Sequence, residues 1–423
     1  MRLIDDTYFI QTKKDLYIAY FPLRRICFYI NKTGKEELKE LIVNETKDTN
    51  YNENIIEYYN LLRTIKPHKP NYINYKISDF NYATIILTNQ CNFSCMYCYA
   101  KNDRDNVTMT LVQVDQIINF VFQNSTKKVL FSFIGGGEPT MSWELLEYSI
   151  NKINEQAKIR SFKTKIKLVT NGSLLSEKRI AWIKKNNLLV SISFDILPEI
   201  QDSQRNISNA SSFNMVDKNL RLLGKEKVSM GIRSTITHRN VDLMTKMVKF
   251  VASKYPFIKK LRFEPECNAN VQMDDLFKKF VPSFMNARNE AIKNNITLNC
   301  SYSINLKKIK HRFCYGELCF TPNGMISGCH RVINFNEPRF KEFSLGSFKD
   351  DIEINLNKFN KLNTTNTFEN TECNKCFAKY HCAGNCYFES LILTTEQKKN
   401  ICDNIRTLVK ELLIEKINKD ENK

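Results

Sequence analysis

The chain has 423 residues, of which 42% are hydrophobic and 26% are charged, and its formal net charge at pH 7 is +18. This length predicts two or three domains, and this composition is ordinary for a soluble globular protein. No apolar run approaches the ~18 residues that a membrane-spanning helix needs, which excludes a helical membrane protein. The N-terminus has no basic flank before a long apolar core, so we expect no signal peptide and, by default, a cytoplasmic location.

The positive charge has two interpretations. Solvated lysines would carry no functional meaning, whereas clustered Lys and Arg would attract an acidic peptide or a nucleic acid. No single block of basic residues decides between them. A nucleic-acid-modifying protein would also need a basic groove or a known RNA module, and neither is apparent.

Residues 1–80 are expected to form a small α+β unit. Aromatic and β-branched runs predict strands at residues 8–10, 16–21 and 26–30, and helices are expected at 35–43 and 52–65. The unit resembles, without a diagnostic motif, the winged-helix domain that binds leader peptides in peptide-modifying enzymes. That domain binds its ligand by adding a strand to a sheet edge. A plain structural extension is the alternative.

Residues 81–300 alternate between expected strands and expected helices. The strands are predicted at residues 83–87, 128–134, 165–170, 188–194, 228–237 and 260–264. The helices are predicted near residues 110–124, 142–157, 174–186, 213–223, 241–253 and 274–294. Six such units predict an α/β fold, a partial (β/α)6 TIM-type barrel, whose chemistry collects at the C-terminal ends of the strands.

The cysteines are clustered rather than scattered. Three of the fourteen lie at residues 91–98 and eight lie between residues 314 and 402, whereas Cys27, Cys267 and Cys300 stand alone and are expected to pack in the core. Without an export signal, a disulfide framework is not expected, because the cytosol keeps thiols reduced. Clustering of this kind indicates metal ligation.

The first cluster, Cys91-x3-Cys95-x2-Cys98, comes just after the first predicted barrel strand. Three thiolates can hold three irons of a [4Fe–4S] cluster and leave the fourth iron open, whereas a structural zinc site closes its shell with four ligands. The spacing, with Tyr97 before the last cysteine, resembles the signature of the radical S-adenosylmethionine (radical SAM) enzymes. The resemblance implies a cluster bound by these three cysteines and S-adenosylmethionine as the cofactor.

A glycine run follows the second predicted strand and resembles a second motif of that family. Gly136, Gly137, Glu138 and Pro139 match the Gly-Gly-Glu-Pro motif that contacts the cofactor's methionine amino group. Gly135 precedes them, where related maturases often carry a larger polar residue. The resemblance adds four cofactor-binding residues, which are Tyr97, Asn171, Ser193 and Arg205. For three of them an ordinary role is the alternative: a turn for Asn171, a strand-end polar group for Ser193 and a surface arginine for Arg205.

Residues 301–423 carry a second cysteine pattern that resembles the C-terminal extension called SPASM. The resemblance implies two auxiliary [4Fe–4S] clusters and therefore a cysteine-rich iron–sulfur domain, although two four-cysteine zinc sites also fit the ligand count. The cluster nearer the active site would take Cys314, Cys319, Cys329 and Cys386. The outer cluster would take Cys373, Cys376, Cys382 and Cys402.

The resemblance implies an enzyme that cleaves S-adenosylmethionine to a 5′-deoxyadenosyl radical, which abstracts hydrogen from a residue of a ribosomally made precursor peptide. A thioether or C–C crosslink is the expected product, with flavodoxin or ferredoxin as the electron donor. The alternative is an anaerobic sulfatase-maturating enzyme, and a nucleic-acid-modifying radical SAM enzyme is a third reading. Sulfatase-maturating enzymes place an aspartate after the cysteine matching Cys329. Here His330 stands there and is a candidate catalytic residue, or a structural one.

Overall fold

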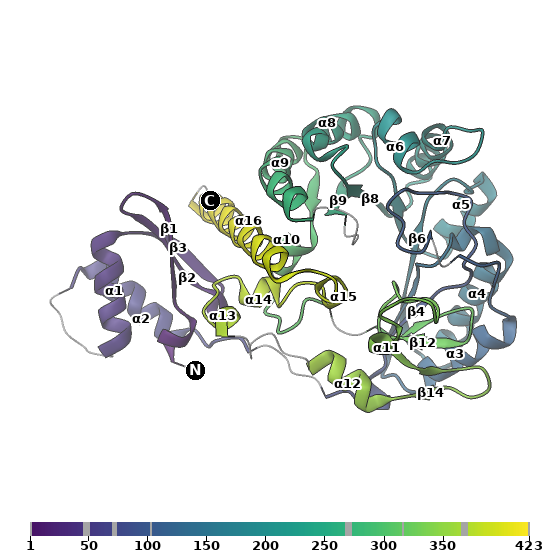
Figure 1. Ribbon diagram of the computed structural model, residues 1–423, viewed down its shortest axis with the longest axis horizontal. Coiled ribbons are helices and arrows are strands. Elements are labelled where there is room, and N and C mark those ends of the chain that lie inside the picture. The colour runs from purple at the N-terminus through teal and green to yellow at the C-terminus, as the bar shows by residue number, and fades with distance from the viewer. Residues whose placement is uncertain are drawn as a thin grey trace.

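The computed structural model describes residues 2–44, 51–69, 74–101, 104–266, 273–314, 317–364 and 371–421, so that Cys267 lies outside the described residues. A crescent-shaped barrel occupies one end of the molecule and a small sheet-and-helix unit occupies the other, with a long C-terminal helix between them (Figure 1). Within the described residues, no helix is both long enough and apolar enough to cross a membrane.

The N-terminal unit is a three-stranded antiparallel sheet followed by two helices. The strands are β1 (Tyr8–Lys13), β2 (Leu16–Phe21) and β3 (Ile26–Asn31), in the order β1-β2-β3. Helices α1 (Lys32–Asn44) and α2 (Glu53–Thr64) cover one face of the sheet, and their side chains bury Ala19 and Phe21 in a small core. The five elements predicted for this stretch are all present.

The other face of this sheet packs against the C-terminal region. Ile10, Ile18 and Tyr20 alternate with the residues of the small core, as strand geometry requires, and they belong to the main hydrophobic core. The buried hydroxyl of Tyr20 is hydrogen-bonded to Nε2 of His381, 361 residues later in the chain. The sheet is therefore covered on both faces and is held against the cysteine-rich region.

The barrel is built on parallel strands, as predicted. Its sheet runs in the order β10-β9-β8-β7-β6-β5-β4, with every neighbouring pair parallel. The strands are β4 (Tyr82–Ile85), β5 (Lys128–Phe133), β6 (Lys163–Thr170), β7 (Leu189–Ser193), β8 (Met230–Ile236), β9 (Lys260–Pro265) and β10 (Thr297–Asn299). The six predicted strands are confirmed, and the three-residue β10 is additional.

Helices follow the strands and cover the outside of the barrel (Figure 1). They are α3 (Leu111–Gln123), α4 (Trp143–Ile159), α5 (Glu177–Lys185), α6 (Pro198–Gln204), α7 (Ser212–Lys225), α8 (Met244–Lys254) and α9 (Met273–Lys293). Each begins where the sequence allows. Thr110, for example, caps α3 by accepting from the backbone N–H of Gln113, whose side chain reaches back to the N–H of Thr110. The short α6 is the helix of the barrel that periodicity did not predict.

The C-terminal region extends the same sheet and adds short helices. Strands β11 (Cys319–Phe320), β12 (Met325–Ser327), β13 (Ser344–Ser347) and β14 (Glu353–Ile354) continue it beyond β4. The helices are α10 (Ser301–Asn305), α11 (Phe340–Phe343), α12 (Leu356–Thr364), α13 (Thr371–Asn374), α14 (Lys379–Cys382), α15 (Tyr387–Ser390) and α16 (Thr395–Glu421). Because β11 pairs in parallel with β4, the cysteine-rich region is joined directly to the strand that precedes Cys91.

Asp6 is a fully buried carboxylate of the N-terminal unit. It accepts a hydrogen bond from the backbone N–H of Leu23 at 2.9 Å, and Nη1 of Arg24 lies 3.7 Å from its Oδ2. Burial is the largest influence on this group and raises the pKa of Asp6 from 3.8 to about 7, against the opposing effects of the hydrogen bond and Arg24.

We expect the N-terminal unit to lose stability as the pH rises from 6 to 8. A carboxyl with a folded pKa of about 7 holds its proton more tightly than in the unfolded chain, so the stability that it contributes is full below about pH 4 and falls as the pH rises through 7. The loss between pH 6 and pH 8 is about 1 kcal/mol. Asp6→Asn should remove it and the exposed Asp15→Asn should not, as measured by thermal unfolding at both pH values. An Asp6→Asn protein with the wild-type pH dependence would contradict this.

Candidate active site

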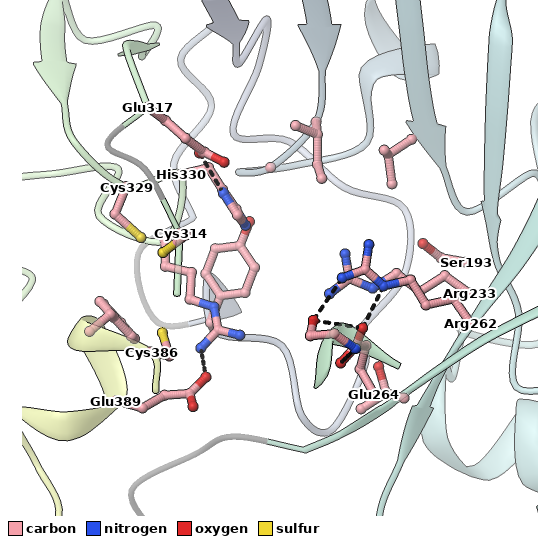
Figure 2. Close-up of a pocket in the computed structure, with 18 of the residues that line it drawn as sticks. Ser193, Arg233, Arg262, Glu264, Cys314, Glu317, Cys329, His330, Cys386 and Glu389 are labelled. Atoms are coloured by element: carbon pink, nitrogen blue, oxygen red, sulfur yellow. Dashed lines mark hydrogen bonds and ion pairs between the residues drawn. The ribbon is translucent and has the colours of Figure 1, made fainter. Parts of the chain in front are cut away.

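A cavity of about 590 Å³ lies between the barrel and the cysteine-rich region. Its lining includes the three-cysteine loop, the glycine run, the ends of β6 to β9 and three of the later cysteines. Figure 2 shows Cys314, Cys329 and Cys386 on one side of this space, and Ser193 and two arginines on the opposite side. The cavity therefore brings together segments more than 200 residues apart in sequence.

The three-cysteine loop is anchored by backbone hydrogen bonds to the segment that ends α6. The N–H groups of Ser94 and Met96 donate to the carbonyls of Asn206 and Gln204 at 2.8 and 2.9 Å. Cys91, Cys95 and Cys98 all line the cavity. The loop thus presents three thiols to one space, as a cluster with three protein ligands requires.

The environment of these thiols suits a cluster that is held by thiolates. Burial raises the pKa of Cys91, and it raises the pKa of Cys95 to about 11 although Arg205 opposes the shift. Such thiols are neutral at pH 7 by themselves, and a bound metal converts them to thiolates. Nη2 of Arg104 lies 3.3 Å from Sγ of Cys98 and can stabilise the thiolate form. The residues of this loop fit an iron–sulfur cluster.

The glycine run lies directly against the cysteine loop. Its backbone donates from Gly137 to the carbonyl of Thr88 and from Glu138 to the carbonyl of Gln90, at 2.9 and 2.7 Å. A Cβ at Gly137 would lie 1.8 Å from the carbonyl oxygen of Gln90, so that no other residue fits there without rearrangement. Gly136 has φ +58°, which also favours glycine.

The carboxylate of Glu138 is hydrogen-bonded to neighbouring residues of the protein. Its carboxylate accepts from the hydroxyl of Thr170 at 2.6 Å and from the backbone N–H of Asn171 at 2.7 Å, and also from Thr140. Burial raises the pKa of Glu138, and these donors oppose that shift. The side chain therefore fixes the glycine run to the end of β6. Pro139 is buried and is not part of the cavity lining.

Asn171 connects the end of β6 to the cysteine loop. Its Nδ2 donates to Oδ1 of Asn92 at 2.9 Å, and its Oδ1 accepts from the hydroxyl of Ser173 at 2.7 Å. Ser193, the last residue of β7, lines the cavity beside it in sheet order. Both predicted residues thus lie at C-terminal ends of parallel strands.

Tyr97 and Arg205 meet at a buried carboxylate that the sequence interpretation did not assign. Nε of Arg205 donates to Oδ2 of Asp195 at 3.1 Å, the hydroxyl of Tyr97 donates to the same oxygen, and the guanidinium lies 5.2 Å from the centre of the Tyr97 ring. Asp195 also accepts from Ser234 and from the N–H of Thr235. The sequence did carry a signal for this residue, because Asp195 follows the C-terminal end of β7, where site residues of a barrel collect.

The eight later cysteines fall into two spatial groups. In the near group, burial and then the thiols of Cys314 and Cys329 are among the influences that raise the pKa of Cys386, and Cys329 likewise raises that of Cys319. In the outer group, burial and the thiols of Cys402, Cys376 and Cys373 raise the pKa of Cys382. The SPASM resemblance divides the cysteines in the same way, and their role as ligands of two auxiliary clusters stays a prediction. Cys314, Cys329 and Cys386 line the cavity, and the outer four do not.

No three His, Cys, Asp or Glu side chains among the described residues converge as ligands of one metal ion. A cubane cluster binds each cysteine at a different iron and so needs thiols arranged around a space.

His330 lies on the wall of the cavity next to Cys329. Its Nδ1 is 2.8 Å from Oε2 of Glu317, and its ring meets that of Tyr99 edge to face with centroids 6.0 Å apart. Burial would raise the pKa of Glu317, but His330 and Lys167 lower it overall. The ionised Glu317 therefore holds Nδ1 of His330 and fixes the orientation of the ring.

Several cavity residues were missed by the sequence interpretation. Lys167, Arg233, Arg262 and Glu264 all point into the barrel from β6, β8 and β9. The signal was present, because charged residues at alternate positions of a strand that is otherwise buried must face an interior space. Arg104 was missed because it follows the cysteine loop in an irregular segment.

The sequence of the chain is similar to those of several curated proteins. The radical SAM cyclopropyl synthase TigE of Paramaledivibacter caminithermalis is 21% identical over 369 residues, which cover 78% of this chain and 73% of TigE. Two other curated relatives, an uncharacterised one and a cysteine-type anaerobic sulfatase-maturating enzyme of Clostridium novyi, match over only 59% and 46% of their own lengths.

Two solved structures have a similar fold. Native anSMEcpe with bound AdoMet has a TM-score of 0.68 at 20% identity, over 80% of this chain and 99% of that one. Streptococcus suis SuiB bound to precursor peptide SuiA has a TM-score of 0.54 at 13% identity, over 94% and 98%.

Residues 85–251 match the sequence profile of the radical SAM superfamily. This segment begins at the end of β4, contains the cysteine loop and the glycine run, and reaches through β8 into α8. With the parallel barrel and the three thiols that share its cavity, this match assigns residues 85–251 to the radical SAM superfamily.

Proposed function

We propose that the protein is a radical SAM peptide maturase, which oxidatively modifies a residue of a precursor peptide and forms a thioether or C–C crosslink. The observation that carries the proposal is the single cavity that joins three elements: the three-cysteine loop, the glycine run and the near cysteine group. A substrate bound in that space would contact a source of radicals on one side and an electron-transfer centre on the other.

The cofactor pair would be held by the barrel. Cys91, Cys95 and Cys98 would bind a [4Fe–4S] cluster, and the backbone of Gly136 and Gly137 would approach S-adenosylmethionine closely because neither glycine carries a Cβ. When bound, this pair supplies a hydrogen-abstracting 5′-deoxyadenosyl radical. Glu138 would position the glycine backbone rather than contact the cofactor, since four donors already occupy its carboxylate.

The chain's own residues would prepare the reaction in three further ways. Asn171, Ser193 and Arg205 would orient the cofactor, and Asp195 would keep the Arg205 side chain in place through their 3.1 Å contact. Tyr97 would fill the space behind the cysteine loop and exclude water. His330 would accept or return a proton, with Glu317 holding its Nδ1.

The eight later cysteines would hold two auxiliary [4Fe–4S] clusters. A cluster with four protein thiolates has no open iron, so its role is electron transfer, tuned by burial and hydrogen bonding. The near group would receive the electron from the substrate radical because three of its cysteines line the cavity. The outer group would pass that electron outward to an acceptor, whereas a donor such as a flavodoxin or ferredoxin would supply the electron that the three-cysteine loop's cluster needs.

The N-terminal unit would bind the precursor's leader segment. Its edge strands β1 and β3 pair only with β2 among the described residues, so that each leaves one row of backbone groups for an added strand. The solved complex of SuiB with precursor peptide SuiA, a fold relative, supports a peptide as the class of substrate.

The second candidate function is maturation of a sulfatase. The fold similarity to anSMEcpe, with a TM-score of 0.68, favours it. His330, at the place where sulfatase-maturating enzymes carry an aspartate, counts against it. A short peptide reading frame beside the gene would support the first function, and an adjacent sulfatase would support the second.

Replacing Cys91, Cys95 and Cys98 together with alanine should abolish reductive formation of 5′-deoxyadenosine. It should also lower the iron content of anaerobically reconstituted protein from about twelve to about eight atoms per chain, since one cubane of four irons is lost. Iron analysis and product chromatography measure both effects. Cys27→Ala, outside the cavity, is the control and should change neither. Continued cleavage in the triple variant, or zinc in place of iron at the later cysteines, would contradict the respective assignment.

Gly137→Ala should weaken S-adenosylmethionine binding by at least tenfold, because the new Cβ would displace the Gln90 backbone on which the loop rests. Equilibrium dialysis of the iron-loaded protein measures the affinity. Gly231→Ala on β8 is a matched control, since its Cβ would meet nothing closer than 3.3 Å. Equal affinities of the two variants would remove the glycine contact from the proposal.

Adding the synthetic precursor peptide should protect the amides of β3 or β1 from hydrogen exchange, because a strand added at either edge would pair with them. Mass spectrometry of exchange-labelled protein locates the protection, with the amides of α5 as the internal reference. Protection confined to the cavity would show that the leader is not bound by this sheet.

A further inference from the structure

Two arginines from neighbouring strands face the cavity at the same level. Arg233 on β8 and Arg262 on β9 are register partners in the parallel sheet, and both line the cavity. Figure 2 shows their guanidinium groups beside each other, across the space from Cys314, Cys329 and Cys386. Like charges placed opposite each other on adjacent strands repel, so that this arrangement needs negative charge nearby.

The protein itself supplies one carboxylate for this pair. Nε of Arg262 donates to Oε1 of Glu264, and Nη2 of Arg262 donates to the hydroxyl of Ser301 at 2.8 Å. The same Ser301 hydroxyl donates to Glu264 at 2.9 Å, which closes a small network. Glu264 is therefore already committed to Arg262.

Arg233 has no such partner. Its side chain forms no hydrogen bond and no ion pair with any of the described residues. Burial and the charge of Arg262 lower the pKa of Arg233. Lys167, a third cation of the barrel interior, has its pKa lowered by burial and by the charges of Arg233 and Arg262. A buried charge is costly unless it is paired, so an anion from outside the protein would relieve this cost.

Two other arginines on the cavity wall are paired with carboxylates. Arg205 pairs with Asp195 at 3.1 Å and Arg331 pairs with Glu389 at 2.8 Å. Arg104 contacts Sγ of Cys98. Arg312, whose Nη1 has no hydrogen-bond partner among the described residues, lies near Cys314 and the other near cysteines. On the barrel side, the uncompensated charge is concentrated around Arg233.

We propose that Arg233, supported by Arg262, binds a carboxylate of the peptide substrate, so that the modified residue or its immediate neighbour is Asp or Glu. This inference rests on the proposed function. A guanidinium matches a carboxylate with two parallel hydrogen bonds and so fixes both position and orientation. A peptide side chain anchored there would cross the space between the proposed cofactor residues and the near cysteine group.

The cofactor's own carboxylate is the other source of the same chemistry. The residues assigned to the cofactor are attached to the three-cysteine loop, Asn171 through Asn92 and Arg205 through Tyr97. Arg233 has no such contact with a residue attached to the loop. Its register partner on β9, Arg262, is hydrogen-bonded to Ser301 at the start of α10, away from the loop. These positions favour the peptide.

The test compares two small probes on the iron-loaded protein saturated with S-adenosylmethionine. They are N-acetylglutamate N-methylamide and its neutral isostere N-acetylglutamine N-methylamide, with binding followed by ligand-observed NMR titration. Wild-type protein should prefer the acidic probe by about tenfold, as expected for one charge-assisted pair. Arg233→Met and Arg233→Gln should reduce the preference to within about twofold. Lys308→Met, which removes an exposed cation of the same cavity, should preserve it.

Controls for folding, for S-adenosylmethionine affinity and for S-adenosylmethionine cleavage separate the possible failures. Iron content and circular dichroism identify any variant that has not folded, and Arg233→Gln then replaces Arg233→Met. No preference in the wild type, or an unchanged preference in both Arg233 variants, would overturn the inference. So would a tenfold loss of S-adenosylmethionine affinity with the probe preference retained, because the arginine would then serve the cofactor. Cleavage of S-adenosylmethionine by the wild type tests the proposed function separately, and its absence would refute that function alone.

Discussion

The contact between the backbones of Gly137 and Gln90 is the constraint on which the rest of the site depends. Only a residue without a Cβ allows these two loops to touch, since an added Cβ would lie 1.8 Å from the Gln90 carbonyl oxygen. Two backbone hydrogen bonds then tie the glycine run to the residues just before Cys91. Glu138 extends the contact to the end of β6. The loops after three successive barrel strands are thereby held as one unit.

Charge is the second organising feature of the cavity. Among the residues that the structure describes, nine Lys and Arg side chains line it against five Glu side chains, and no Asp contributes to the lining. An excess of cations in a partly buried space suits anionic occupants, and clusters held by thiolates are anionic. Arg104 beside Cys98 and Arg331 close to the near cysteine group fit this account. Arg233 lies farther along the barrel, which is why we assign it to the substrate instead.

The N-terminal sheet connects peptide binding to the electron-transfer region in our proposal. Helices α1 and α2 cover one face of the sheet, and the other face packs on the cysteine-rich region through Ile10, Ile18 and Tyr20. Tyr20 is hydrogen-bonded to His381, which directly precedes the outer cysteine Cys382 in the sequence. A leader held at the sheet edge would therefore be attached to the same rigid part of the molecule that carries the outer cysteines.

The sequence by itself determined the elements whose signal is local. Alternating strands and helices predicted the barrel, and cysteine spacing separated the three-cysteine loop from the eight later cysteines, because ligand spacing and hydrophobic periodicity are both properties of short segments. The division of those eight into two sets came from the resemblance to the SPASM extension. Only the tertiary structure decided what long-range packing brings together. Asp195 beneath Tyr97 and Arg205, the pairing of β11 with β4, and the opposed Arg233 and Arg262 all depend on strand register. Register is set by contacts between segments far apart in the chain, which no local pattern records.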